Sequence, residues 1–389
     1  MATPLIILSD LHLSHESSVA TAQALAELVA ATPGHEVVLN GDIFGLSHDP
    51  KERDPVESVC TLLRRSPVLV ATLRAHLASG YPLTLLAGNH DAAVAEGAMR
   101  DGLIALLDVQ PGAPVTLEPW FIRRGGVHVE HGHLWDPDNA PSHPLAPWSA
   151  ATEPLGIQLT RRFVAKHGVW EFAHAHETTL VAGMERAFRL FGARTPALIA
   201  RYFAISGLIC AETLGERGLG RERSLGERAL ALQAERTGVS ANALRQLISS
   251  APLPTHLTFQ STFLRLYFDR VVSVLGVGVG GAATLLRANP LAALLALASA
   301  GYLWSNVKQS GSRYQNQPIA RLRDGAQFVR RATGAELVVF GHTHVPEAAD
   351  GYRNAGSFGY PAQPSRRPYL SVDSDGSPHA RLFTSPAGS

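Results

Sequence analysis

Cysteine is scarce in this 389-residue sequence, which contains only Cys60 and Cys210. The two are far apart, and neither belongs to a C-x-x-C pair or to the Cys/His spacing of a zinc site. The sequence therefore excludes a disulfide framework and a structural zinc finger as sources of stability, and we expect a reducing compartment. Because 46% of the residues are hydrophobic, there is enough apolar material for one large domain or two smaller ones.

The N-terminus also lacks the features of a secretory signal. The segment MATPLIILSD contains no Lys or Arg, and its apolar run LIIL is four residues long. A signal peptide has a basic region followed by an apolar stretch of about 7–15 residues. We therefore expect a cytoplasmic protein.

The net charge is close to zero, but the charges are segregated along the chain. Residues 155–331 contain 22 Lys and Arg against 10 Asp and Glu, whereas the remainder contains 12 against 23. The middle thus carries +12 and the ends carry −11. A basic block beside an acidic remainder favours an anionic partner, either a phosphorylated ligand or an anionic membrane surface. We expect no specific nucleic-acid partner.

Five short clusters of Asp, His and Asn each follow a short apolar run. Apolar runs of four to six residues that end in a polar turn predict buried strands. In open α/β architectures, sites assemble at the carboxyl ends of strands, because loops converge there while the sheet holds them rigid. One such cluster alone is a weak signal, since a lone His is more often structural. In order, the clusters are SDLHLS (9–14), NGDIFG (40–45), AGNHD (87–91), EHGH (130–133) and FGHTH (340–344).

The middle of the chain has a different character from its ends. After the Pro-rich segment APSHPLAPW (140–148), residues 155–250 are rich in Ala, Leu and Arg at helical spacing, without strand alternation. We therefore expect a core formed by residues 1–150 and 332–389, interrupted by a helical insertion over 151–331. Other expected elements are helices over 17–31 and within 55–78, and short antiparallel strands from 336 onward.

The insertion contains two nearly continuous apolar runs, at 271–286 and 291–307, separated by Arg287-Ala288-Asn289-Pro290. Each run is shorter than the ~20 residues that a membrane-spanning helix needs. Two interpretations of this hydrophobic hairpin, about 271–304, remain open. It is either buried core, or a hairpin or lid that touches a membrane without spanning it. The absence of striping and the basic flanking residues favour the second, with peripheral contact to the inner face of the cell membrane.

Taken together, the five clusters resemble the calcineurin-like metallophosphoesterase superfamily. The superfamily pattern D-x-H, G-D, G-N-H-D, a His at a strand end and G-H-x-H is matched here at every position. The resemblance covers about residues 1–135 and 335–389. It implies an α+β fold in which a β-sandwich is flanked by helices, with the long all-helical insertion lying before the last metal motif.

The resemblance also implies a centre of two divalent metal ions. Asp42 would bridge the ions, and a hydroxide between them would attack phosphorus while the cations neutralise its oxygens. A mixture of nitrogen and oxygen donors suits Mn, Fe or Zn better than Ca, and Mn is our first choice. The implied ligands are Asp10, His12 and His344 for one ion, and Asn89, His131 and His342 for the other.

His90 is the implied catalytic residue. In the resembled superfamily the His of G-N-H-D contacts the phosphoryl oxygens and helps to protonate the leaving group, a role to which imidazole is suited. Asp91 is expected to fix the turn or to orient a neighbouring His, and His133 either reaches the site or is structural. Four other histidines are expected to be solvated surface residues: His15, His48, His174 and His176.

The motif layout is closest to UDP-2,3-diacylglucosamine pyrophosphohydrolases of lipid A synthesis, which begin with SDLHL, carry GDxF and place a helical lid before GHTH. This sequence has GNHD where they have GNRD, EHGH where they have HGD, and a much longer insertion. The expected activity is hydrolysis of a phosphodiester, pyrophosphate or phosphomonoester in a lipid-linked or membrane-associated substrate. Two alternatives remain: a soluble nucleotide phosphodiesterase or nuclease-like enzyme, and a membrane-interaction or scaffold protein on the same core.

Overall fold

The computed structural model describes residues 3–15, 19–170, 180–215, 219–287, 289–308 and 317–384. His174 and His176 lie outside the described residues. The chain folds into two compact units, of which the first comprises Met1–Arg161, Gly218–Pro254 and Ile319–Ser389, and the second comprises Arg162–Arg217 and Thr255–Pro318. The predicted insertion, 151–331, is thus divided between the two units.

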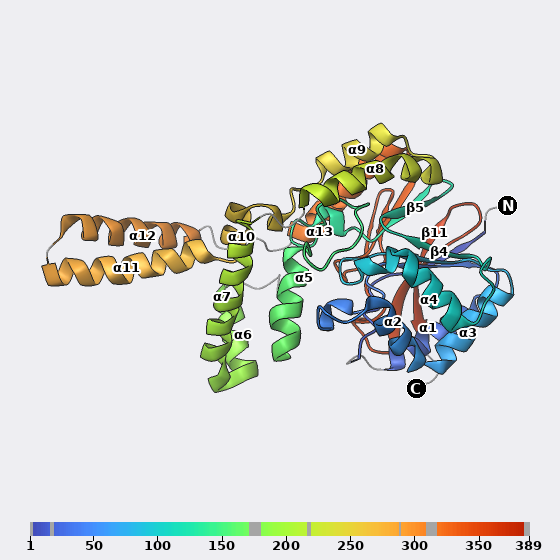
Figure 1. Cartoon of the computed structure of the whole chain (residues 1–389), viewed down its shortest axis with the longest axis horizontal. Helices are drawn as coiled ribbons and strands as arrows, with labels where there is room; N and C mark the ends of the chain where they lie inside the picture. Colours follow the sequence, from blue (N-terminus) through green and yellow to red (C-terminus); the bar gives the residue numbers. More distant parts are fainter. Residues whose placement is uncertain are drawn as a thin grey trace. The chain divides into compact units, whose positions relative to one another are not determined.

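Two β-sheets form the centre of the first unit (Figure 1). One contains β1 (Leu5–Leu8), β2 (Glu36–Asn40), β3 (Leu83–Leu86), β4 (Val115–Glu118), β10 (Arg366–Val372) and β11 (Pro378–Thr384), in the order β11-β10-β1-β2-β3-β4. The other contains β5 (Phe121–Arg124), β6 (Val127–Glu130), β7 (Leu337–Phe340), β8 (Glu347–Ala349) and β9 (Tyr352–Asn354), in the order β5-β6-β7-β9-β8. Strands β1 to β4 are parallel to one another, and so are β6, β7 and β9.

The apolar strand residues alternate between two cores because successive side chains of a strand point to opposite faces. In β1, Leu5 and Ile7 pack between the two sheets, whereas Ile6 and Leu8 face the helices. The inter-sheet core also takes Val129 of β6 from the second sheet. The predicted α+β fold with a β-sandwich is therefore confirmed.

Helices cover the outer face of each sheet. The six-stranded sheet packs against α1 (Val19–Ala31), α2 (Pro55–Arg64), α3 (Pro67–Ala78) and α4 (Gly97–Leu107). The five-stranded sheet packs against α8 (Leu219–Thr237), α9 (Ala241–Ser250) and α13 (Gln317–Thr333). Leu230 of α8, Leu244 of α9 and Leu322 of α13 are fully buried. This burial explains why parts of the predicted insertion belong to the first unit.

Sequence signals at the start of α2 agree with its position. Asp54 accepts hydrogen bonds from the backbone N–H groups of Val56 and Glu57, and Pro55 occupies the first helical turn. Both features are typical of helix N-termini. The predicted helical region 55–78 is accordingly two helices, α2 and α3.

The C-terminal strands differ from the prediction in one respect. Antiparallel pairing holds for β8 with β9 and for β10 with β11, but β9 pairs parallel with β7, with Val338 opposite Tyr352. Because the chain reverses between β8 and β9, β9 returns in the direction of β7. The local sequence pattern carries no information on that direction.

The second unit is helical in its described residues. It contains α6 (Leu180–Phe191), α7 (Thr195–Glu212), α10 (Phe259–Arg265), α11 (Phe268–Arg287) and α12 (Pro290–Lys308). Helices α11 and α12 form a hairpin (Figure 1). They approach closely at Gly280, where an added Cβ would lie 2.7 Å from the carbonyl oxygen of Ala292. The predicted hairpin is thus present, packed through small residues.

The short α5 (Leu155–Leu159) belongs to the first unit. So do the single-turn segments that follow the motif strands: η1 (Leu46–His48), η2 (Ala92–Ala95) and η3 (His133–Trp135). In each of these segments, the chain that follows a motif turns back toward the carboxyl ends of the strands.

Candidate metal centre

The five motifs meet at the carboxyl ends of neighbouring parallel strands. Motifs one to three follow β1, β2 and β3, and motifs four and five follow β6 and β7. Val129 of β6 pairs with Val339 of β7, so His131 and His342 emerge at the same edge. The predicted arrangement of the motifs at strand ends is what the structure has.

Nitrogen and oxygen atoms of the motif side chains form three groups, each within 4.8 Å. Asp42 belongs to two of them. Its Oδ2 lies 3.9 Å from His12 Nε2 and 3.2 Å from His131 Nε2, so this carboxylate stands between the two predicted ligand sets. The groups are Asp10, His12 and His344; His12, Asp42 and His90; and Asp42, His131 and His342. His90, which was predicted to act apart from the metal ligands, therefore has a ring nitrogen within 4.8 Å of ligand atoms of His12 and Asp42.

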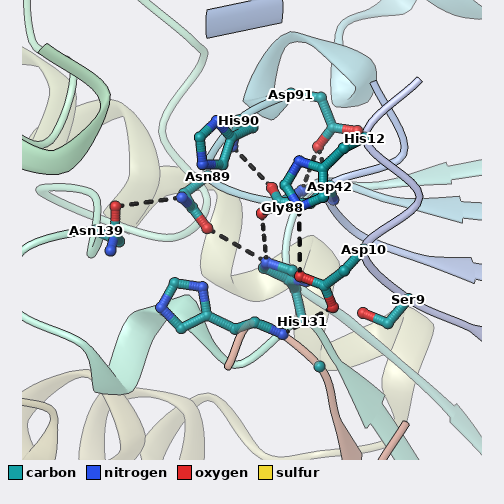
Figure 2. Close-up of polar contacts among 12 residues, drawn as sticks. Ser9, Asp10, His12, Asp42, Gly88, Asn89, His90, Asp91, His131 and Asn139 are labelled. Carbon is teal, nitrogen blue, oxygen red and sulfur yellow. Dashed lines mark hydrogen bonds and ion pairs between the residues drawn. The ribbon is translucent and has the colours of Figure 1, made fainter. Parts of the chain in front are cut away.

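The predicted ligands of the second ion have suitable atoms facing one another. His131 Nε2 is 3.3 Å from Asn89 Oδ1 (Figure 2), while its Nδ1 is hydrogen-bonded to the backbone oxygen of Asn40 at 2.9 Å. His342 Nε2 is hydrogen-bonded to Asp136 Oδ2 at 2.9 Å. Its Nδ1 is buried and has no hydrogen-bond partner among the described residues. In each of the two rings, one nitrogen is hydrogen-bonded to a residue that is not a predicted ligand, which leaves the other nitrogen available to a cation.

The predicted ligands of the first ion are equally close. His12 Nε2 and His344 Nε2 are 3.0 Å apart, and Asp10 Oδ1 is 3.2 Å from His344 Nε2. The ring of Tyr360, which the sequence did not single out, lies 5.3 Å from that of His12 and 6.0 Å from that of His344. Two imidazole nitrogens directed at each other beside a carboxylate suit a shared cation.

Backbone strain is concentrated at these motifs. Seven non-glycine residues in the described part of the chain have a positive φ, and five of them are predicted metal ligands. The left-handed conformation costs roughly 1–2 kcal/mol for an L-residue, so it persists where the surroundings impose it, commonly at functional sites. The five, with φ between 48° and 67°, are Asp10, His12, Asp42, His342 and His344.

Two glycines make room for the ligands. An added Cβ at Gly88 would lie 2.2 Å from Asp42 Oδ1, and one at Gly41 would lie 2.4 Å from Cγ of His131. Gly41 also has a φ of 74°, a conformation that glycine adopts at little cost. The glycines of the G-D and G-N-H-D motifs are thus required by close approach to ligands.

The electrostatics of the buried ligands favour bound cations. Burial opposes ionisation of Asp10, yet His344 and His131 lower its pKa to about 2. Burial likewise opposes protonation of His131, yet Asp42 and Asp10 raise its pKa to about 10. Ionised carboxylates buried without solvent require compensating positive charge. Divalent ions would supply it.

Asp91 holds the turns beneath the ligands. Its carboxylate accepts hydrogen bonds from the backbone N–H groups of Asp42, Ile43, Phe44 and Gly88, at 2.7–3.2 Å. Burial and the neighbouring Asp42 raise the pKa of Asp91 to about 7, while these amides act in the opposite direction. Of the two roles predicted for Asp91, the geometry supports fixing the turn.

His90 lies over the ligands with both its backbone and its ring held. Its N–H donates to Asp42 Oδ1 at 2.8 Å, and its Nδ1 is 2.5 Å from Ser47 Oγ. The expectation that His48 is a solvated loop residue is wrong, because η1 folds it back to within 6.3 Å of the His90 ring. Burial lowers the pKa of His48 to about 3.

His133 is buried beside the second ligand set. Its ring lies 5.4 Å from that of His131 and 6.5 Å from that of His342. Burial, with the two neighbouring histidines, holds its pKa well below the usual value. The structure therefore brings His133 to the site as a neutral neighbour of two ligands.

A hollow opens beside His90 in the first unit. Its lining includes the apolar Trp148 and Ile157 and the cationic Lys51, Arg53 and Arg161. Arg161 is paired with Glu153 at 2.7 Å and Arg53 lies 3.6 Å from Asp49, so the charges partly cancel. The hollow is thus bordered by His90 and by the predicted ligand Asn89.

Residues 3–196 match the model of the family described as calcineurin-like phosphoesterase. The match includes the first four motifs, and the motif with His342 and His344 lies beyond it. The comparison with curated proteins found no match.

Proposed function

We propose that this metal-dependent phosphoester hydrolase, whose residues 3–196 match the calcineurin-like phosphoesterase family, uses two divalent ions to hydrolyse a phosphodiester, pyrophosphate or phosphomonoester. The observation that carries the two-ion proposal is the place of Asp42, which belongs to two groups of potential ligands. Manganese is the proposed metal, because imidazole and carboxylate donors occur together in both sets.

Divalent ions bound by the seven ligands would neutralise the phosphoryl oxygens and activate a water molecule for attack. The chain's own residues hold and orient the reactants. Asp42 and Asp91 fix the turn that presents His90. As an imidazolium, His90 would donate its Nδ1–H to the Ser47 hydroxyl and could give its Nε2 proton to the departing oxygen, which leaves a neutral ring. The hollow beside His90 would receive that leaving group.

Removing the metal should abolish hydrolysis of both bis-p-nitrophenyl phosphate and p-nitrophenyl phosphate. After EDTA treatment, adding Mn²⁺ should restore activity, with two ions bound per chain. Ca²⁺ at the same concentration should restore less, because it prefers oxygen ligands. Full activity of metal-free protein, or restoration with one ion per chain, would contradict the proposal.

We further propose that the substrate is lipid-linked or membrane-associated, and that the hairpin of α11 and α12 brings the enzyme to it. The large apolar side chains of the hairpin face solvent: Leu285 is 89% exposed and Leu291 is 75% exposed. One helix in the described residues, Phe268–Leu286, is long and apolar enough to cross a membrane, with a mean hydropathy of 1.4 and 6% burial of its apolar window. This exposure argues against the buried-core interpretation.

Shallow insertion is the form of contact that we propose. Arg287 is the last residue of α11 and Asn289 precedes α12, so full crossing would carry a charge through the bilayer at a cost of about 2.5–3.5 kcal/mol or more. The basic excess of residues 155–331 would add attraction to anionic lipids, about 1 kcal/mol for each basic residue near the surface.

The intact protein should float with anionic vesicles at low salt. Deleting 271–304 should release it while sparing hydrolysis of a small soluble ester, because the hairpin lies outside the first unit. The triple substitution Leu285→Asp, Leu286→Asp and Leu291→Asp should also release it. Leu382→Asp, at an apolar residue 52% exposed on β11, is the matched control and should not. If the intact protein binds neither vesicles nor detergent micelles, the membrane proposal is contradicted, whereas the hydrolase proposal is not affected.

A further inference from the structure

The loop that follows η3 lies against two predicted ligands of the second ion. Asp136 Oδ2 is 2.9 Å from His342 Nε2, and Asn139 Oδ1 accepts a hydrogen bond from Asn89 Nδ2 at 3.2 Å (Figure 2). The two loop residues are themselves joined, since Asn139 Nδ2 donates to Asp136 Oδ2 at 2.8 Å. A single series of hydrogen bonds therefore connects His342, Asp136, Asn139 and Asn89.

Asp136 determines which nitrogen of His342 is available to a cation. A carboxylate accepts, so Nε2 of His342 donates to it and the lone pair is on Nδ1. That Nδ1 is buried without a hydrogen-bond partner among the described residues.

Asn139 determines which end of the Asn89 amide is available. The amide nitrogen is a donor and cannot bind a cation, whereas the amide oxygen can. Because Asn139 presents its oxygen, Asn89 turns Nδ2 toward it and directs Oδ1 to within 3.3 Å of His131 Nε2. The orientation of Asn139 is in turn set by its donation to the Asp136 carboxylate.

We propose that Asp136 and Asn139 are positioning residues for the second metal ion: through one series of hydrogen bonds they fix the ring of His342 and the amide of Asn89. The inference rests on the proposed two-ion function. Neither Asp136 nor Asn139 is proposed to contact the substrate or to bind the first ion.

Helix α5 packs against the loop that carries Asp138 and Asn139. The N–H of Gly156 donates to the backbone oxygen of Asp138 at 2.8 Å, and an added Cβ at Gly156 would lie 2.2 Å from Asn139 Oδ1. A side chain at 156 would therefore displace the Asn139 amide. Alanine is the better helix former of the two residues, so Gly156→Ala tests the position of Asn139 without weakening the helix or removing a hydrogen-bonding group.

The test is calorimetric titration of EDTA-treated protein with MnCl₂, which reports the two ions separately. In Asp136→Ala and in Asn139→Ala, one of the two ions should bind about 10–100-fold more weakly, the range found when partners of metal ligands are removed. The other ion should bind as in the wild type. Gly156→Ala should weaken the same ion. Asp136→Asn, which keeps one acceptor, should retain more affinity than Asp136→Ala.

Asp138→Asn is the matched control in the same loop and should bind both ions as the wild type does, because the backbone N–H of Asp138, and not its side chain, donates to Asp136. Unchanged binding of both ions in Asp136→Ala and Asn139→Ala would overturn the proposal. So would equal weakening of both ions, which indicates a general loss of structure. A wild-type protein that takes up fewer than two ions would overturn the two-ion function and this inference with it.

Discussion

Asp42→Ala should lose both metal ions and hydrolytic activity together. Asp42 Oδ2 lies within 4 Å of nitrogens from both ligand sets, so the substitution removes a ligand from each ion. The lost carboxylate also accepts the N–H of His90 at 2.8 Å, and its removal frees the turn that carries the proposed catalytic residue. Bound metal, measured by elemental analysis after dialysis, should fall from two ions per chain to none, and the rate to that of metal-free protein.

Two further variants distinguish the effect of the negative charge of Asp42 from that of its backbone conformation. Asp42→Asn keeps an oxygen for the His90 amide but removes the negative charge, and it should also fail to hold two ions. Asp108→Asn is the matched control, since Asp108 shares a positive φ while its side chain is 83% exposed beside Arg74. It should bind two ions and remain active. Two-ion occupancy that persists in Asp42→Ala would show that Asp42 does not bridge.

His90→Ala should reduce turnover about 10²- to 10⁴-fold on a substrate with a poor leaving group, such as phenyl phosphate, while both ions remain bound. General acid catalysis typically contributes that range. The penalty should be smaller on p-nitrophenyl phosphate, because p-nitrophenolate departs without a proton. Steady-state kcat on the two substrates, with bound metal measured in parallel, is the comparison that decides.

The controls for His90 are its two neighbours. Ser47→Ala removes the hydroxyl at His90 Nδ1 and should lower kcat less than His90→Ala does, because the ring stays in place. His48→Ala removes a ring 6.3 Å away and should have little effect. An equal loss in His90→Ala on both substrates would assign His90 to binding of the phosphoryl group and not to proton transfer.

The ligand motifs could be predicted because each is local: an apolar strand followed at once by its polar turn. Asp136 and Asn139 could not, because their partners His342 and Asn89 lie 206 and 50 residues away in sequence, and only the tertiary contact reveals them. Similarly, the apolar stripe of α8 has the same spacing whichever surface it covers. The sequence therefore predicted its helix and not its place on the five-stranded sheet.

The distance along the chain between Asp10 and His342 bears on how the enzyme is made. The backbone N–H of His342 donates to Asp10 Oδ2 at 3.0 Å across 332 residues. During synthesis the N-terminal ligands leave the ribosome first, and their partners follow only after the whole second unit has been translated. Loop-closure entropy rises slowly, by about 0.6 kcal/mol per doubling of length, so a long insertion is inexpensive at equilibrium. Kinetically it matters more, since contacts distant in sequence form late. We therefore expect a nascent chain to hold Asp10, His12 and Asp42 as an acidic half-site, and to become active only when β7 and its turn dock.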